Sequence, residues 1–201
     1  MTLATTLPKT GERECRSLVQ PVETRTQGAG MTVRGYAAVF GEVAEVAGVF
    51  AETVAPGAFA RSLGSDDIRA FYDHDTALVL GRNRAGTLRL AEDGKGLAVE
   101  IDLPDTSAGR DVRTLIERGD VSGMSFGFEV VSEEWDFSQP MPLRTIRDVN
   151  LFEVSIVSIP AYAGTTIALR SLESARKTDI RSFAPLARLR MKIGLDLTQR
   201  S

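Results

Sequence analysis

The sequence predicts a single mainly β domain with a few helices (α+β), in which the strands close or nearly close into a β-barrel. Short runs of apolar residues recur between residues 31 and 159, separated by the glycines, aspartates and prolines typical of turns. Helical spacing of apolar residues is confined to a few segments. With 201 residues, 43% of them hydrophobic, the chain can bury a sizeable core. A barrel would hide the edges of so many strands economically.

The expected strands are short, strand-like in composition and bounded by turn residues such as Gly41, Gly86 and Gly94. They cover residues 31–40, 50–54, 68–72, 78–82, 87–91, 97–103, 122–135 and 145–159, the last as one strand or two.

Two helices interrupt these strands. Proline suits the first turn of a helix, so the Pro-Gly pair at 56–57 predicts a short helix through residue 63. The clearer helix follows residues 105–107, three candidate N-caps, and ends at Gly119. Its apolar stripe consists of Val112, Leu115 and Ile116.

The ends of the chain differ in composition from its body. Residues 1–29 predict a flexible leader, residues 30–169 a folded domain, and residues 170–201 a C-terminal tail that is helical or removable. The candidate tail helix would align Leu186, Leu189, Ile193 and Leu197. The body carries a net charge of −9 and the tail +5. This distribution argues against a general or specific nucleic-acid binder and leaves the tail either solvated or bound to an acidic partner.

Several classes of protein are disfavoured by what the sequence lacks. No apolar run approaches the roughly 20 residues that span a bilayer, and residues 1–14 do not resemble a secretory signal, so we expect a cytoplasmic protein without a membrane partner. The only cysteine, Cys15, excludes an internal disulfide, and its polar surroundings argue against a catalytic thiol. One histidine and scattered carboxylates do not make a usual zinc site. We expect no metal and no cofactor.

A candidate nucleophile lies in the segment 121–130. If this segment is extended, Met124, Phe126 and Phe128 share a core-facing side, and Ser125 faces the other. Glycines at 123 and 127 leave the Ser125 hydroxyl uncrowded, as a reacting group needs. A serine merely tolerated in a strand explains the same pattern, and Ser122 is a rival nucleophile.

Two further residues could complete a catalytic set. His74, the only histidine, follows an apolar run and lies between Asp73 and Asp75, although a solvated loop histidine would look the same. Glu153 interrupts an apolar run, so it needs a partner or faces solvent on an exposed strand. Together with Ser125, they offer a nucleophile, a base and an orienting carboxylate.

Three blocks carry a family resemblance: Phe-Tyr-Asp-His-Asp at 71–75, Ser-Gly-Met-Ser-Phe-Gly-Phe at 122–128, and Leu-Phe-Glu-Val-Ser-Ile-Val-Ser-Ile-Pro-Ala at 151–161. Together with the segments 34–40 and 54–59, they resemble the prohead maturation serine proteases of tailed phages, which are related in fold to the herpesvirus assemblins. The resemblance covers about residues 30–170 and implies a barrel of the herpesvirus-protease type.

The resemblance implies a function and a set of roles. Ser125 would be the nucleophile, His74 the general base and Glu153 the third member, in place of the second histidine of the herpesvirus relatives. Asp148 and Asp75 are fallbacks for the acid. A phage endopeptidase of this kind acts inside the procapsid in the host cytoplasm. It cleaves the scaffolding segment of the major capsid protein or the scaffold protein, and itself. A homo-oligomer is a further expectation.

Two other classes of protein remain open from the sequence. A catalytically silent scaffold or internal capsid assembly protein could use the same fold. Alternatively, a small-ligand binder could line a cavity with Trp135 and the phenylalanines.

Overall fold

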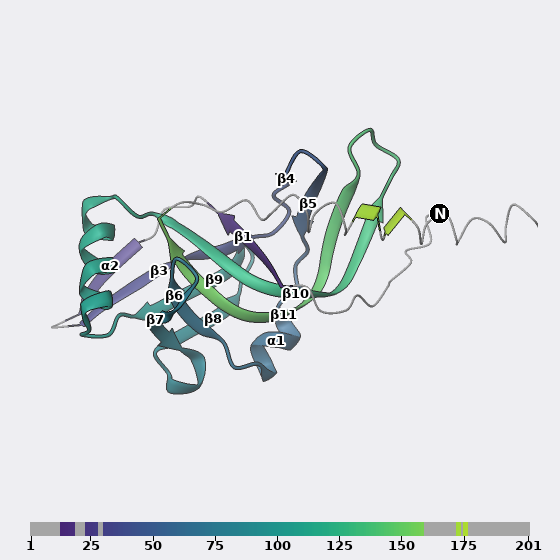
Figure 1. Cartoon of the computed structure of the whole chain (residues 1–201). Coiled ribbons are helices and arrows are strands. Elements are labelled where there is room, and N and C mark those ends of the chain that lie inside the picture. The colour runs from purple at the N-terminus through teal and green to yellow at the C-terminus, as the bar shows by residue number, and fades with distance from the viewer. Residues whose placement is uncertain (1–12, 19–22, 28–29, 159–171, 174, 177–201) are drawn as a thin grey trace, which may run out of the picture.

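The computed structural model describes residues 13–18, 23–27, 30–158, 172–173 and 175–176. Its strands form two sheets built around one long hairpin, whose two strands run side by side across the molecule as curved ribbons (Figure 1). The seven-stranded sheet has the order β1-β10-β11-β5-β4, and β6 pairs with both β11 and β7. The bounds of its strands are β1 Glu14–Leu18, β4 Ala44–Val46, β5 Phe50–Val54, β6 Arg69–Tyr72, β7 Asp75–Arg82, β10 Gly123–Asp136 and β11 Leu143–Val157.

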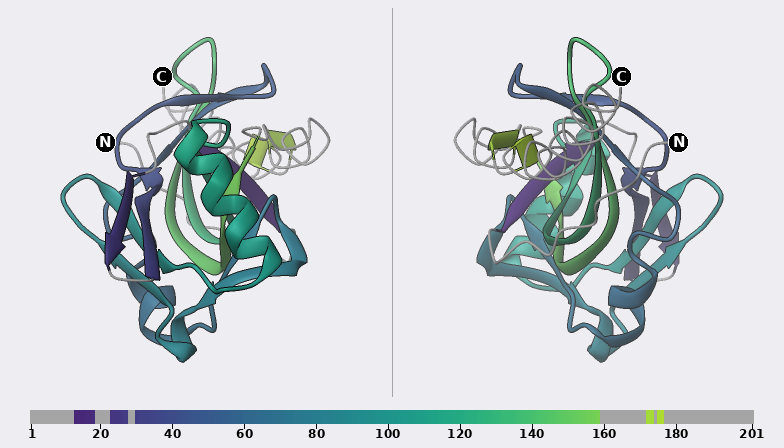
Figure 2. Two further views of the ribbon diagram at one scale, coloured as in Figure 1. Left: turned by 90° about the vertical axis from the view of Figure 1, so that its left-hand side faces the viewer. Right: turned by 90° about the vertical axis from the view of Figure 1, so that its right-hand side faces the viewer.

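The second sheet has four antiparallel strands in the order β2-β3-β9-β8. Two α-helices and a 3₁₀ turn complete the described fold, and α2 lies at one end of the molecule (Figures 1 and 2). The bounds of these elements are β2 Glu23–Gln27, β3 Gly30–Val39, β8 Leu88–Glu92, β9 Gly96–Asp102, α1 Ala60–Ser65, α2 Ser107–Arg118 and η1 Asn83–Ala85.

The mainly β class is confirmed, but the predicted barrel closure is not found. In the part of the chain that the structure describes, the two sheets are not closed into a barrel. Apolar residues of both sheets, such as Val33, Leu97, Phe126 and Ile146, instead pack into one buried core. The outermost strand β4 has only three residues, and a strand this short offers little free edge to a neighbouring chain.

The strands predicted between residues 31 and 159 are confirmed, and the helices largely so. The side chain of Thr106 caps α2 by accepting from the N–H of Gly109 at 3.2 Å, and Gly119 ends it in the left-handed region. The first helix begins later than predicted, at Ala60. Gly57 has a φ of 88°, which no right-handed helix accommodates, so the Pro-Gly pair belongs to the preceding turn.

The flexible leader predicted for residues 1–29 is wrong for two segments, because β1 and β2 lie within it. β1 pairs antiparallel with β10 over its whole length. The tail helix predicted over residues 186–197 lies outside the described residues. Of the predicted tail, Leu172 and Ala175 are described and buried, and Leu172 packs against Val46 and Phe50.

The face of β10 predicted to enter the core does so: Met124, Phe126 and Phe128 are buried there. Trp135 instead packs in a second cluster, where its ring centroid lies 4.9 Å from that of Phe50. Trp135 and Phe50 thus pack against each other, whereas Phe126 is among the residues that line a pocket. Among the described helices, none has the length and apolar character needed to cross a membrane.

Candidate active site

A tight hairpin turn positions His74. β6 ends at Tyr72, which pairs with Asp75 at the start of β7, so Asp73 and His74 form a two-residue turn. Both have positive φ, 48° and 60°, as a type I′ hairpin turn requires. Aspartate and histidine tolerate this region better than most residues. The turn is tied to the end of β11, because Ser158 donates to the Asp73 carboxylate from its backbone N–H at 2.8 Å and from its hydroxyl.

The structure brings His74 and Glu153 together. The Nδ1 atom of His74 lies 2.6 Å from Oε1 of Glu153, and the hydroxyl of Ser155 donates to Oε2 at 2.6 Å. Both carboxylate oxygens are therefore engaged, and the side chain is only 13% exposed. The sequence indicated that a glutamate within an apolar run needs partners, and His74 and Ser155 are those partners. With the Nδ1 proton directed at the carboxylate, Nε2 is the nitrogen left to act as a base.

Gly127 makes room for this pair. It lies opposite Glu153 in the ladder between β10 and β11. A Cβ at this position would collide with the Glu153 carboxylate, approaching its Cδ and Cγ to 3.0 Å. A residue with a side chain would therefore push the carboxylate away from His74. The sequence suggested that Gly127 leaves room for the Ser125 hydroxyl. In the structure it also leaves room for the Glu153 carboxylate.

Ser125 lies on the same ladder but is covered. It is opposite Ser155 of β11 on one side and Ser17 of β1 on the other, and its exposed fraction is 0%. Its hydroxyl donates to the backbone carbonyl oxygen of Arg16 at 2.8 Å. Within the described residues, no hydrogen bond joins Ser125 to His74, and the Nε2 atom of His74 is buried without a hydrogen-bond partner.

Cys15 is the residue of this site that sequence analysis missed. It lies opposite Gly127, and its sulfur, a His74 ring nitrogen and a Glu153 carboxylate oxygen are all within 4.8 Å of one another. The nearby Cys15 sulfur and the Glu153 carboxylate raise the pKa of His74 to about 10, against the opposing effect of burial. The ring is therefore a cation at neutral pH in this arrangement. These three side chains are also of the types that bind Zn²⁺.

The rival residues are not part of this cluster. Ser122 is exposed and precedes β10. Asp148 pairs with Arg61 at 3.0 Å, and the exposed Asp75 accepts from the backbone N–H of Ala77 at 2.8 Å. Of the candidate acids, Glu153 is the one that contacts His74.

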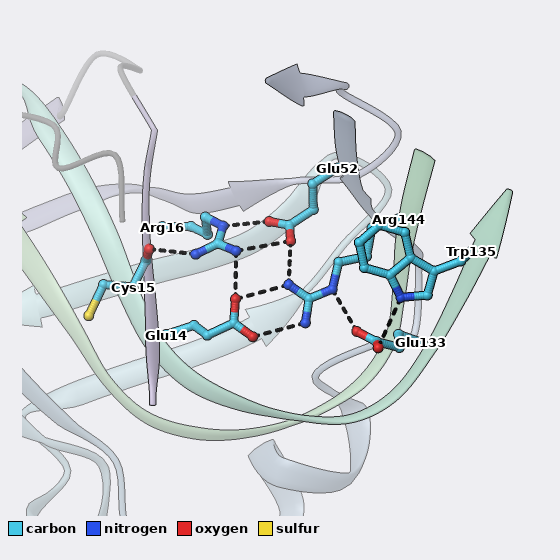
Figure 3. Close-up of polar contacts among 7 residues, drawn as sticks. All are labelled: Glu14, Cys15, Arg16, Glu52, Glu133, Trp135 and Arg144. Atoms are coloured by element: carbon cyan, nitrogen blue, oxygen red, sulfur yellow. Dashed lines mark hydrogen bonds and ion pairs between the residues drawn. The ribbon is translucent and has the colours of Figure 1, made fainter. Parts of the chain in front are cut away.

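A buried ionic network adjoins the site on the other side of β1 (Figure 3). Arg144, fully buried, contacts three carboxylates: Glu14 at 2.9 Å, Glu52 at 2.8 Å and Glu133 at 2.6 Å. Arg16 contacts Glu52 and Glu14, each at 2.6 Å. Burial opposes the ionisation of Glu14, yet its bonds to Arg144 and Arg16 lower its pKa to about 2. Sequence analysis missed this network, because its members are far apart in the chain.

Comparison with known proteins adds independent information. The family described as caudovirus prohead serine protease matches residues 20–179. The prohead protease of Enterobacteria phage HK97 is 31% identical over 140 residues, covering 67% of this chain and 57% of that protein. The prohead protease of Escherichia phage T5 is 32% identical over 74 residues, covering 37% and 34% respectively. The chain thus spans little more than half the length of the first relative and about a third of the second.

A solved structure shares the fold. The capsid assembly protease of bacteriophage T4 superimposes with a TM-score of 0.51 at 11% identity, covering 74% of this chain and 98% of that one. The matched sequence region, residues 20–179, includes His74, Ser125 and Glu153. The chain belongs to the caudovirus prohead serine protease family.

Proposed function

We propose that this chain is a serine endopeptidase of phage capsid maturation, with Ser125 as nucleophile, His74 as general base and Glu153 as the orienting acid. One observation carries the proposal: His74 Nδ1 lies 2.6 Å from the carboxylate of Glu153. Glu153 belongs to β11, which pairs with β10, the strand that carries Ser125. A serine hydroxyl is a poor nucleophile until a base takes its proton. A histidine held by a carboxylate is suited to that task.

In each of the two proposed steps, acylation and deacylation, His74 first accepts a proton and then gives it away. The Ser125 hydroxyl turns from the Arg16 carbonyl to Nε2 of His74, which takes its proton as the oxygen adds to the substrate carbonyl. Glu153 holds the ring through Nδ1 and stabilises the imidazolium that forms. His74 then gives the proton to the leaving amine, and water hydrolyses the ester by the same route. Ser155 keeps the Glu153 carboxylate in place through its hydrogen bond of 2.6 Å.

The proposed substrates are the scaffolding segment of capsid subunits or a scaffold protein, and the protease itself, within the procapsid in the host. The names of the relatives support this proposal: two are prohead proteases and one is a capsid assembly protease. Membership of a serine protease family supports the reaction class.

The test is co-expression of the full chain with the capsid subunit of its phage, followed by mass spectrometry of the subunit. Wild-type chain should remove the scaffolding segment, and Ser125→Ala or His74→Ala should abolish cleavage, because removal of either group from a working triad costs on the order of 10⁶ in turnover. Glu153→Ala should also reduce cleavage strongly. Ser122→Ala is the matched control and should cleave normally. Unchanged cleavage by Ser125→Ala would refute the assignment.

A silent assembly protein on the same fold is the second candidate, favoured by the complete burial of Ser125. The same experiment separates the two functions. A silent assembly protein would leave the subunit uncut with every variant, and its removal would prevent particle formation.

A further inference from the structure

β1 occupies the free side of β10 at the position of the nucleophile. Arg16 pairs with Phe126 and Ser17 with Ser125, and the carbonyl of Arg16 receives the Ser125 hydroxyl at 2.8 Å. An extended peptide that adds a strand to a sheet edge gains affinity from the backbone ladder and specificity from pockets for alternate side chains. β1 has this arrangement, since it is an edge strand of the larger sheet.

The side chains of β1 divide between two environments. Figure 3 shows Cys15 pointing to the opposite side of the strand from Glu14 and Arg16. Cys15 lies beside His74 and Glu153. Arg16 lies over the ring of Phe128, 5.6 Å from its centroid, and reaches Glu52 with two nitrogens, at 2.6 and 3.0 Å. The alternate residues Glu14 and Arg16 therefore enter a charged pocket, while the residue between them faces the catalytic cluster.

The folded body supplies the receiving half of this pocket. Glu52 comes from β5, Glu133 from β10 and Arg144 from β11, and Arg144 Nε donates to Glu133 at 2.6 Å. Glu133 also accepts from the indole N–H of Trp135 at 3.0 Å, which fixes its orientation. Glu14 then meets the two terminal nitrogens of Arg144, each at 2.9 Å. The body thus presents one cation for an acidic residue and one carboxylate for a basic residue two positions later.

We propose that β1 pairs with β10 as a substrate strand would, and that Glu52 and Arg144 form a subsite that recognises a Glu-x-Arg segment immediately before the cleaved bond. The inference rests on the proposed protease function and names its substrate class: extended peptides with an acidic residue two positions before a basic one. A pocket beside Arg16 and Ser17 is lined in part by Val43, Glu52 and Phe126.

The peptide bond presented to Ser125 is the one that follows the basic residue. In a substrate bound as β1 is, the Ser125 oxygen adds to the carbonyl carbon of the arginine while His74 takes the hydroxyl proton. The C–N bond to the next residue then breaks, and its amine takes that proton from His74. Water hydrolyses the arginyl ester and restores the serine. In this chain the corresponding bond joins Arg16 to Ser17.

β1 also excludes other substrates while it is docked. With β1 docked, Ser125 is completely buried, and the carbonyl oxygen of Arg16 accepts the hydroxyl hydrogen that His74 would have to take. A substrate in trans must therefore displace β1, which makes β1 an intramolecular competitor.

The experiment uses the full-length chain and a reporter in which Glu-Cys-Arg-Ser-Leu joins two folded proteins. We expect cleavage after the arginine, identified by mass spectrometry of both fragments. Arginine-to-glutamate substitution in the reporter should slow cleavage at least about tenfold, because a buried charge loses its partner. The Glu52→Arg chain should show the reverse preference. If thermal melting shows that this variant does not fold, Glu52→Gln should reduce the preference for arginine over glutamine at that position.

Cleavage of the capsid subunit, measured beside the reporter, separates this inference from the proposed function. If the subunit is cut in a Ser125-dependent manner but the reporter is cut elsewhere, or the Glu52 variants leave the charge preference unchanged, the subsite is refuted and the protease stands. If neither substrate is cut, both are overturned. Reversed preference in Glu52→Arg, or lost preference in Glu52→Gln, supports the subsite.

Discussion

Gly127 and Glu153 lie directly opposite each other between β10 and β11, and the glutamate side chain passes through the space that a side chain at 127 would fill. This relationship links the strand of the nucleophile to the orientation of the base. We expect Gly127→Ala to displace the carboxylate from His74 and to lower kcat at least about tenfold, since small misplacements of catalytic groups cost orders of magnitude. Steady-state kinetics on the capsid-subunit substrate measure this. Gly94→Ala is the matched control, because nothing lies within 4 Å of the Cβ it adds.

The second prediction concerns the pH dependence of activity. Cys15 and Glu153 raise the pKa of His74 to about 10, so the neutral base becomes available only as pH rises toward that value. Cys15→Ala should lower the pKa and move the rising limb of the kcat/KM profile to lower pH. Cys15→Ser, which keeps a hydroxyl beside the ring, should shift it less.

The single histidine makes this prediction directly measurable, because its ring signals in an NMR titration need no assignment. The direction in which the stability of the protein depends on pH follows from the same shift in the pKa of His74. A raised pKa contributes stability that is complete below about 6.5 and is lost as pH rises through about 10. An unchanged titration in Cys15→Ala would show that Cys15 does not act on the ring.

The sequence predicted the elements whose residues follow a local rule. Alternation in β10 and the cap and stop residues of α2 were sufficient to place them. Glu153 could be singled out because it breaks its local rule: a charge inside an apolar run needs a partner, and it has His74 and Ser155.

Other features depend on contacts that no local pattern records. β1 has polar residues on both faces, so it carries no strand signature of alternating apolar residues. Its burial depends on Arg144, 130 residues away from Glu14. Barrel closure likewise depends on which distant strands pair, and the described strands pair into two separate sheets. The cover over Ser125 could therefore not be foreseen.

The third prediction follows from the pKa of Glu14, which pairing lowers to about 2. A lowered pKa contributes stability that is present above about 4.5 and is lost as pH falls through about 2. The shift corresponds to a free energy of unfolding on the order of 3 kcal/mol. Glu14→Gln should remove most of this contribution at pH 7 and little of it at pH 2. Denaturant unfolding across this pH range measures it, with Asp105→Asn, in an exposed pair with Arg110, as control.

The last prediction concerns access to the nucleophile. Arg16→Glu places a carboxylate against Glu52 and Glu14, and repulsion between buried like charges should release β1 from β10. Ser125 should then react with a fluorophosphonate probe at least about tenfold faster than in the wild type, because the wild-type side chain is fully buried.

Arg110→Glu reverses an exposed charge that pairs with Asp105, outside the ionic network of β1, and should leave the labelling rate unchanged. Labelling of the Arg16→Glu chain should disappear with Ser125→Ala and fall sharply with His74→Ala, since the base must take the hydroxyl proton. Mass spectrometry of the labelled peptide identifies the modified serine. Equal rates in Arg16→Glu and wild type, in chains of equal thermal stability, would mean that β1 does not control access to Ser125.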